Sequence, residues 1–473
     1  MLDNTECWLE NNMKSIRKLF GQIDLTKGKV VSNLIIFTLP FFISYFLNSL
    51  YSAVDLIFIG QFSDTYNIAA VSSGTTIMFA INSIITGLAT GGTVVIGQYF
   101  GAHNKDISKV TKNLILYMSI VAIGLLIVMI ILFYPIASWM QLDENTISTA
   151  RIYLFILILG IPFYVGYTTI SAILRGLGNS FAPFVFFSLA VVTNIGLDAI
   201  FVIVLKQGAV GAAIATVIGE IVGFASSLLY LVIFKLPYKI RMDFKMDGNL
   251  VREIVRCGLP IAIQDGLVVI SFAIILAAVS VRGVDYTSAV GITDRVTSFG
   301  FVPLSAIGSA VSTATAQNMG AKKIENVKKY MYAGLVLSVI CGGTMGLLCQ
   351  LIPNQLASLF AGGNTTAQEI AEPYIQSTSL DIFVCTLVFP INAIFIGSGH
   401  TVFAMSQNLG VTFLVRIPVA LILALAVQAE MYVVGLAYCI STAFSLIACV
   451  IFYLSKRWTI LKDDTMKLER ANE

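Results

Sequence analysis

Polar residues interrupt three long apolar stretches in the first half of this chain. Asp55 lies in the first stretch, Asn194 and Asp198 lie four residues apart in another, and Thr216 lies in the one that follows. The i, i+4 spacing puts Asn194 and Asp198 on one face of a helix. Carboxylate, amide and hydroxyl oxygens at one depth can bind a small hard cation, and a buried carboxylate pair can take up a proton. These residues therefore predict a site for sodium ions or protons.

The composition places these residues in a membrane. Of the 473 residues, 57% are hydrophobic and 12% are charged, and the mean hydropathy is +0.87. Such a chain is too apolar for a soluble protein of this length. Its long apolar runs lack the strict alternation of an outer-membrane β-barrel. Because an ionised group at the bilayer centre costs at least ~2.5 kcal/mol, each intramembrane carboxylate is a functional candidate.

Apolar stretches long enough to cross about 30 Å of hydrocarbon predict twelve helices. Their expected limits are 32–59, 68–97, 111–135, 150–174, 183–205, 209–234, 254–281, 287–316, 329–352, 370–397, 402–425 and 431–455. With both termini in the cytoplasm, most of the 29 Lys and Arg residues lie on the cytoplasmic side, as the positive-inside rule requires. We therefore expect a multi-pass protein of the plasma (inner) membrane with cytoplasmic termini.

The two halves of the chain repeat the same sequence features about 220 residues apart. The repeated features are Gln98–Ala102 with Gln317–Ala321, Leu39-Pro40 with Leu259-Pro260, and the segment from Gly176 with that from Gly397. Because each half has six predicted helices, the repeats have the same orientation, and a cleft is expected between them. The predicted fold is an all-α integral membrane protein with twelve transmembrane helices in two six-helix bundles, related by a parallel internal repeat.

The repeat also predicts the division of the chain. We expect a cytoplasmic tail over 1–28, an N-terminal lobe over 29–234 and a cytoplasmic linker over 235–253. A C-terminal lobe follows over 254–456, and a second cytoplasmic tail over 457–473.

The polar residues of the first half are missing from the second. The positions of Asp55, Asn194 and Asp198 are taken there by Ile275, Val415 and Val419. This difference confines the predicted cation site to the first lobe. The alternative is that these carboxylates only bridge helices or are hydrated near the outer interface.

Neighbouring polar residues extend the predicted site. Asn48 and Ser52 share a helix face with Asp55, at spacings of i, i+4 and i+7. Glu220 lies one turn from Thr216, and its role is open between support of the site and a hydrated position in the cleft. Pro40 removes a backbone hydrogen bond from the helix that carries Asp55, so a hinge is expected there.

Two carboxylates lie inside the second half. Asp265 is predicted near the middle of the seventh helix and Asp381 near the middle of the tenth. They could line the cleft and attract cationic substrates, or they could be hydrated without a specific ligand.

The sequence lacks the groups that an enzyme would need. It has only two histidines, His103 and His400, and no Cys/His metal set, nucleophile elbow or phosphate loop. We therefore expect no enzyme activity, no cofactor, no metal apart from the possible sodium ion, and no nucleic-acid partner.

Several of these segments together resemble the multidrug and toxic compound extrusion (MATE) transporters. The resemblance runs from Leu39-Pro40 through YSAVDLIFIGQF, GQYFGA, LRGLGNSFAPF and NIGLD with GAVGAAIAT to QNMGAKK, and covers nearly the whole chain. It implies two six-helix bundles, cation-coupled export and a substrate cleft between the lobes.

The resemblance also assigns roles to residues of this chain. Asp55, Asn194, Asp198 and Thr216 look like the cation or proton site in the first lobe of prokaryotic members, and Pro40 looks like their bending proline. The chain departs from the branch with a second-lobe cation site, because Val268 lies where a glutamate is expected.

These features favour a sodium- or proton-coupled antiporter that exports amphiphilic, cationic drugs or toxic organic compounds by alternating access, as a monomer in the lipid bilayer. A flippase for lipid-linked saccharides is an alternative, but it should have a basic cleft, and only Arg295 and Arg416 are candidates for one. A membrane-embedded enzyme would need a catalytic set that the sequence does not complete. A channel is a further alternative.

Overall fold

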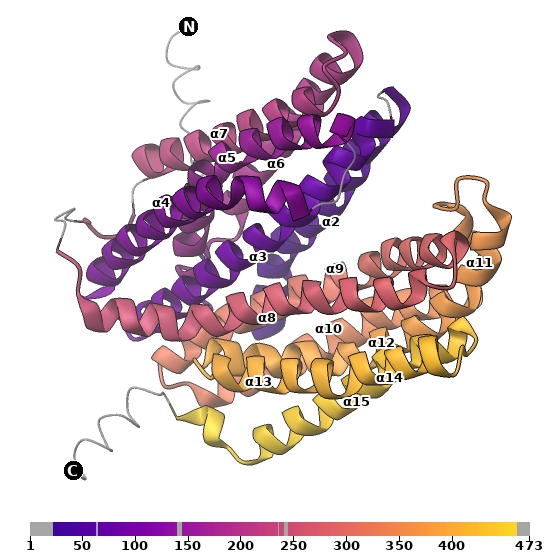
Figure 1. Ribbon diagram of the computed structural model, residues 1–473. Helices are drawn as coiled ribbons and strands as arrows, with labels where there is room; N and C mark the ends of the chain where they lie inside the picture. The colour runs from indigo at the N-terminus through magenta and orange to yellow at the C-terminus, as the bar shows by residue number, and fades with distance from the viewer. Residues whose placement is uncertain (1–21, 63–64, 140–143, 235, 241–244, 461–473) are drawn as a thin grey trace, which may run out of the picture.

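The structure is a computed structural model that describes residues 22–62, 65–139, 144–234, 236–240 and 245–460. Within these ranges all regular structure is helical (Figure 1). Twelve of the helices are long and apolar enough to cross a membrane, in agreement with the predicted number. Large apolar side chains such as Ile127, Ile131 and Val232 point outward from them and are exposed, as expected of surfaces that face lipid.

Six of these helices form the first half of the chain. Its elements are α2 (Val30–Phe62), α3 (Thr65–Gly101), α4 (Ile107–Trp139), α5 (Glu144–Gly176), α6 (Phe181–Asp198) with the π-helical continuation η1 (Ala199–Val204), and α7 (Gly208–Phe234).

The second half repeats this order with more interruptions. Its elements are α8 (Gly248–Ser280), α9 (Val284–Gly320), α10 (Ile324–Leu351), the short α11 (Pro353–Ser358), α12 (Thr365–Gly397), a helix composed of α13 (Thr401–Val411), η2 (Thr412–Arg416), α14 (Ile417–Leu421) and η3 (Ile422–Ala426), then α15 (Met431–Leu454) and the 3₁₀ turn η4 (Arg457–Thr459).

Several helices begin earlier than hydropathy predicts. The seventh spanning helix, α8, starts at Gly248 rather than at 254, because Asp247 caps it by accepting a hydrogen bond from the amide of Asn249. The tenth, α12, starts at Thr365 rather than at 370, where Asn364 accepts from the amide of Ala367. Such caps stabilise a first helical turn even when its residues are polar. A hydropathy window leaves that turn out.

The helix α2 runs without interruption through Pro40. Proline has no amide hydrogen to donate, and the Ser44 hydroxyl donates to the Pro40 carbonyl oxygen one turn later, at 2.7 Å. The hinge role of Pro40 stays a prediction.

The two halves meet along α3, which packs on α5 in its own half and on α8 in the other. The approach of α3 to α8 is so close that a β-carbon on Gly91 would overlap the backbone of Gly258. Figure 1 shows the halves diverging toward the end of the molecule that carries α11. We call the other end, where α3, α5, α9 and α12 finish, the basic end, because Lys105, Arg175, Lys322 and Lys323 lie there.

Candidate functional site

Three helices of the first half bring Tyr51, Asn194 and Thr216 together. Asn194 on α6 donates from Nδ2 to Thr216 Oγ1 on α7 at 3.3 Å, and the Tyr51 hydroxyl on α2 lies 3.2 Å from the same oxygen. Asn194 is only 3% exposed, and its Oδ1 is buried with no hydrogen-bond partner among the described residues. A buried acceptor without a donor is unfavourable. This oxygen is therefore suited to bind a cation.

Asp198 lies one turn beyond Asn194 on the same face of α6. It is 1% exposed, so its carboxyl group lies in the interior of the first half, as Asn194 does. Directly after it the helix continues as the π-helical segment η1, as the equivalent helix of the second half does at η3. The structure thus places a carboxylate within one helical turn of the unpaired amide oxygen.

Small residues on α7 allow it to approach α6 at this point. A β-carbon on Gly219 would lie 2.8 Å from the Ala190 carbonyl oxygen and 3.2 Å from the Asn194 β-carbon. Gly219, three residues after Thr216, therefore helps to bring Thr216 within reach of Asn194. Close helix contacts in membranes commonly depend on such residues.

The helix α2 carries Asp55, Ser52 and Asn48. The side chains of Asp55 and Ser52 lie outside the described residues, and Asn48 is exposed. Tyr51 is four residues before Asp55, so the two positions share a face of α2, and Tyr51 reaches Thr216. The predicted roles of Asp55, Ser52 and Asn48 stay predictions.

Tyr51 is the residue of this cluster that the sequence analysis missed. Its spacing of four residues from Asp55 is a signal that could have found it. A tyrosine in an apolar helix is, however, more often a packing residue, because its ring buries much apolar surface.

Glu220 lies one turn beyond Thr216 on α7 and points toward α5. A β-carbon on Gly160 of α5 would overlap the Glu220 carboxylate, so the glycine provides the space for it. Tyr164 of α5, which pairs with Thr86 at 3.3 Å, interacts with Glu220 electrostatically. Glu220 therefore lies at the α5–α7 interface, and its support of the site stays a prediction.

The second half contains its own buried polar group, centred on Arg416. Its Nε donates to Ser441 at 3.0 Å and one terminal nitrogen donates to Thr442 at 3.5 Å. The guanidinium carbon lies 5.2 Å from the centre of the Tyr438 ring. Asp381, which is 4% exposed, interacts electrostatically with Arg416. Asp381 is thus an interior residue beside a fixed positive charge.

Two further carboxylates lie on α8 and α9. Asp265 is half-buried on α8 beside Gln264. Asp294 on α9 interacts electrostatically with the hydroxyl groups of Tyr374 and Tyr438, and the sequence analysis did not select it.

Within the described part of the chain, no group of three or more His, Cys, Asp or Glu side chains is placed to hold a metal ion.

A family model described as MatE matches residues 40–200 and 260–422, which is one match in each half. The chain belongs to the MatE family. It is accordingly a multi-pass membrane transporter, and the fold resemblance inferred from the sequence is confirmed. Each match lies within one half of the chain and ends before the last long helix of that half, α7 or α15.

Similar proteins share most of the chain. A probable multidrug resistance protein of Bacillus subtilis (strain 168), YoeA, is 28% identical over 437 residues, covering 90% of this chain and 94% of its own. A probable multidrug resistance protein of Thermotoga maritima, NorM, is 25% identical, covering 90% of this chain and 92% of its own. A solved structure described as the outward-facing conformation of a multidrug resistance MATE family transporter matches with a TM-score of 0.84 at 20% identity, covering 93% of this chain and 99% of that chain.

Proposed function

We propose that this MatE transporter exports amphiphilic, cationic organic compounds by alternating access, driven by sodium ions or protons that bind at Asp55, Asn194, Asp198 and Thr216. The observation that carries the proposal is the unpaired, buried Oδ1 of Asn194, one helical turn from the buried carboxyl group of Asp198. Oxygen ligands of these types suit a small hard cation.

Ion binding at this cluster is connected to helix movement through Tyr51. The site residues Asn194 and Thr216 lie on α6 and α7, whereas Tyr51 belongs to α2 and contacts the same Thr216 oxygen. A cation or proton neutralises Asp198 and changes which hydrogen bonds the cluster favours. The position of α2 relative to α6 and α7 therefore depends on the bound ion, and a bend near Pro40 would carry that change along α2.

The substrate class is supported by two kinds of observation. The similar proteins of Bacillus subtilis and Thermotoga maritima are described as probable multidrug resistance proteins. In the second half, the carboxylates of Asp265 and Asp294 form no ion pair with any described residue. Negative charge of this kind attracts organic cations.

The flippase alternative is less well supported, since it requires basic groups that are free to bind phosphates. Arg416 is engaged by Ser441, Thr442 and the Tyr438 ring, which leaves Arg295 as the remaining candidate from the sequence. We further propose that the protein works as a monomer in the plasma membrane with both termini in the cytoplasm, in line with the charge distribution.

The test is dye efflux from proteoliposomes under sodium and proton gradients imposed separately. Asp198→Asn should abolish gradient-driven efflux although the protein still inserts into the membrane. Asp106→Asn is the control, because Asp106 is exposed and its carboxylate pairs with Lys109 of the same helix region, at 2.8 Å. Full efflux by Asp198→Asn would refute the assignment. Counterflow of unlabelled against labelled dye would separate a carrier from a channel or an enzyme.

A further inference from the structure

The glutamines of the two repeated Gln-x-x-Gly-Ala motifs cross between the halves. Gln98 on α3 donates from Nε2 to the carbonyl oxygen of Gly397, the last residue of α12, at 3.0 Å. Gln317 on α9 donates in the same way to Gly176, the last residue of α5, at 2.9 Å. Because Gly176 and Gly397 are themselves equivalent in the repeat, the two bonds form a reciprocal pair. Each half thus donates a hydrogen bond to the last residue of a helix in the other half.

The glycines of the same motifs allow the two backbones to touch. A β-carbon on Gly101 would overlap the carbonyl oxygen of Gln317, and a β-carbon on Gly320 would overlap the carbonyl oxygen of Gln98. The last turns of α3 and α9 therefore lie against each other at the basic end. Any movement that separates the halves at this end must break both glutamine bonds and part these backbones.

A short segment before α2, residues 22–27, lies over this junction, and we call it the strap. Its Ile23 amide donates to Gly178 in the first half at 2.9 Å. Its Leu25 amide donates to Gln317 Oε1 in the second half at 3.0 Å. Asn318 Nδ2 donates to the Leu25 carbonyl oxygen at 3.0 Å. The strap thus bonds to both halves. It binds to Oε1 of Gln317, while Nε2 of the same side chain bonds to Gly176.

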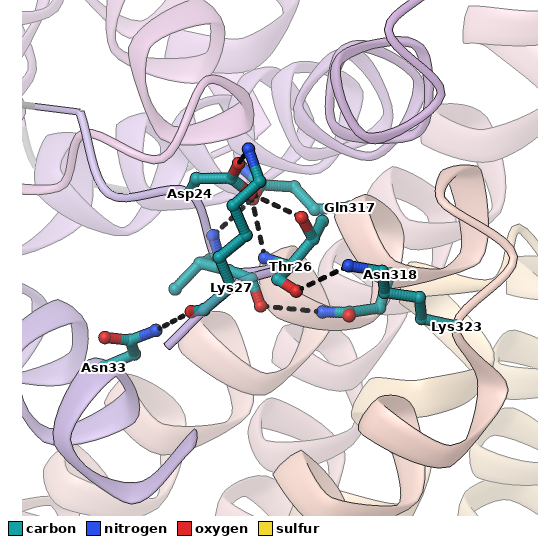
Figure 2. Close-up of polar contacts among 8 residues, drawn as sticks. Asp24, Thr26, Lys27, Asn33, Gln317, Asn318 and Lys323 are labelled. Carbon is teal, nitrogen blue, oxygen red and sulfur yellow. Dashed lines mark hydrogen bonds and ion pairs between the residues drawn. The ribbon is translucent and has the colours of Figure 1, made fainter. Parts of the chain in front are cut away.

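Hydrogen bonds within the strap and one from Lys323 fix its conformation (Figure 2). Asp24 Oδ1 accepts hydrogen bonds from the Thr26 amide at 3.0 Å and the Thr26 hydroxyl at 2.6 Å. Lys323 Nζ donates to the Thr26 carbonyl oxygen at 2.9 Å. The Leu25 side chain is 1% exposed and packs in an apolar cluster with residues of α2 and α9. These contacts distinguish the strap from a solvated tail.

We propose that the reciprocal glutamine bonds and the strap form a latch that keeps the basic end closed and must open in each transport cycle. Gln98 and Gln317 are then positioning residues of transport, which act on the balance between the two access states and do not touch the substrate. The proposal rests on the alternating access proposed above. It is tested without ion gradient or substrate, so its failure and that of ion coupling are distinguishable.

Cys257 on α8 is a natural reporter for opening of the latch. It is 7% exposed and lies beside Gly399, where an added β-carbon would be 3.9 Å from its Sγ and 3.7 Å from Gln98 Nε2. In protein with the other six cysteines replaced, reconstituted in nanodiscs, the rate of Cys257 labelling by a charged maleimide reports the open population. A net hydrogen bond of about 1 kcal/mol corresponds to about five-fold in that population.

Gln98→Ala and Gln317→Ala should each raise the labelling rate about five-fold, and the double variant should raise it further. Gln407→Ala is the matched control, because Gln407 is buried as Gln317 is but bonds within the second half, to Asn392, Ala404 and Ser445. Unchanged labelling in the double variant, or an equal rise in Gln407→Ala, would overturn the latch.

A second measurement needs no cysteine replacement. Hydrogen–deuterium exchange of the Ile23 and Leu25 amides should be faster in Lys323→Met, which removes the bond to Thr26. Lys328→Met is the control, because Lys328 bonds to Glu325 on its own helix at 2.7 Å. Equal exchange in the two variants would refute the role of the strap.

Discussion

Replacing Thr216 by alanine tests the first-half cluster through a residue that carries no charge. The Thr216 oxygen accepts from Asn194 Nδ2 at 3.3 Å and pairs with the Tyr51 hydroxyl at 3.2 Å. Two neutral hydrogen bonds contribute about 2 kcal/mol in total, which corresponds to about thirty-fold in affinity. Without Thr216 the Asn194 amide is no longer oriented, and Oδ1 no longer faces a bound cation. We therefore expect the half-saturating concentration of the coupling ion to rise by up to about thirty-fold in Thr216→Ala.

The assay is initial dye efflux from proteoliposomes as a function of sodium concentration at fixed pH, and of pH without sodium. Ser227→Ala is the matched control on the same helix, because the buried Ser227 hydroxyl donates within α7, to the Phe224 carbonyl oxygen at 2.7 Å. Thr216→Ser keeps a hydroxyl and should restore most of the affinity. If Thr216→Ala and Ser227→Ala have the same half-saturating concentration, the cluster does not bind the coupling ion.

Two further predictions concern the contact between α3 and α8 and the strap. Gly91→Ala puts a methyl group into the backbone of α8 and should destabilise the protein by about 1–3 kcal/mol. The control is Gly124→Ala, whose methyl group meets no atom within 4 Å and should not destabilise the protein. Thermal unfolding in detergent compares the two variants. At the strap, burial acts to raise the pKa of Asp24, but hydrogen bonds from Thr26 and Lys27 outweigh it and lower the pKa overall. Its stabilisation is therefore complete above the unfolded aspartate pKa of about 3.9 and is lost as the pH falls through the lowered pKa. The difference in thermal stability between the wild type and Asp24→Asn should disappear over that range, and a pH-independent difference would contradict this account.

The spanning helices could be predicted because membrane insertion depends on apolar length, which a sequence shows directly. The repeat was equally visible, since Gln98 and Gln317 stand in motifs with the same spacing. Hydropathy failed where a helix begins with polar residues, as at Gly248, because the cap at Asp247 stabilises a turn that is not apolar.

The contacts between helices were not predictable from periodicity. The contact of Tyr51 with Thr216 joins residues far apart in sequence, and it depends on how closely α2 and α7 approach. Residues 1–28 were expected to form a cytoplasmic tail, and the sequence did not indicate that Ile23 bonds to the first half and Leu25 to the second. One buried leucine and a few backbone hydrogen bonds leave no pattern in a sequence, so the strap could be found only in the structure.

The reciprocal bonds give a physical reason why some repeated features persist while others differ. Gln98 needs the carbonyl oxygen of Gly397, and Gln317 needs that of Gly176. The partner of each motif lies in the other half, so a change in one copy removes a contact from both halves.

The ion cluster is different, because its contacts lie within one half. Asn194 bonds to Thr216, and the same Thr216 oxygen pairs with Tyr51. Nothing in that set requires a matching residue at Val415 or Val419. One copy could therefore lose its polar residues without disturbing the other. By this reasoning, substitutions at symmetric motif positions should shift the access equilibrium whichever half carries them, whereas polar substitutions at Val415 and Val419 should leave ion dependence unchanged.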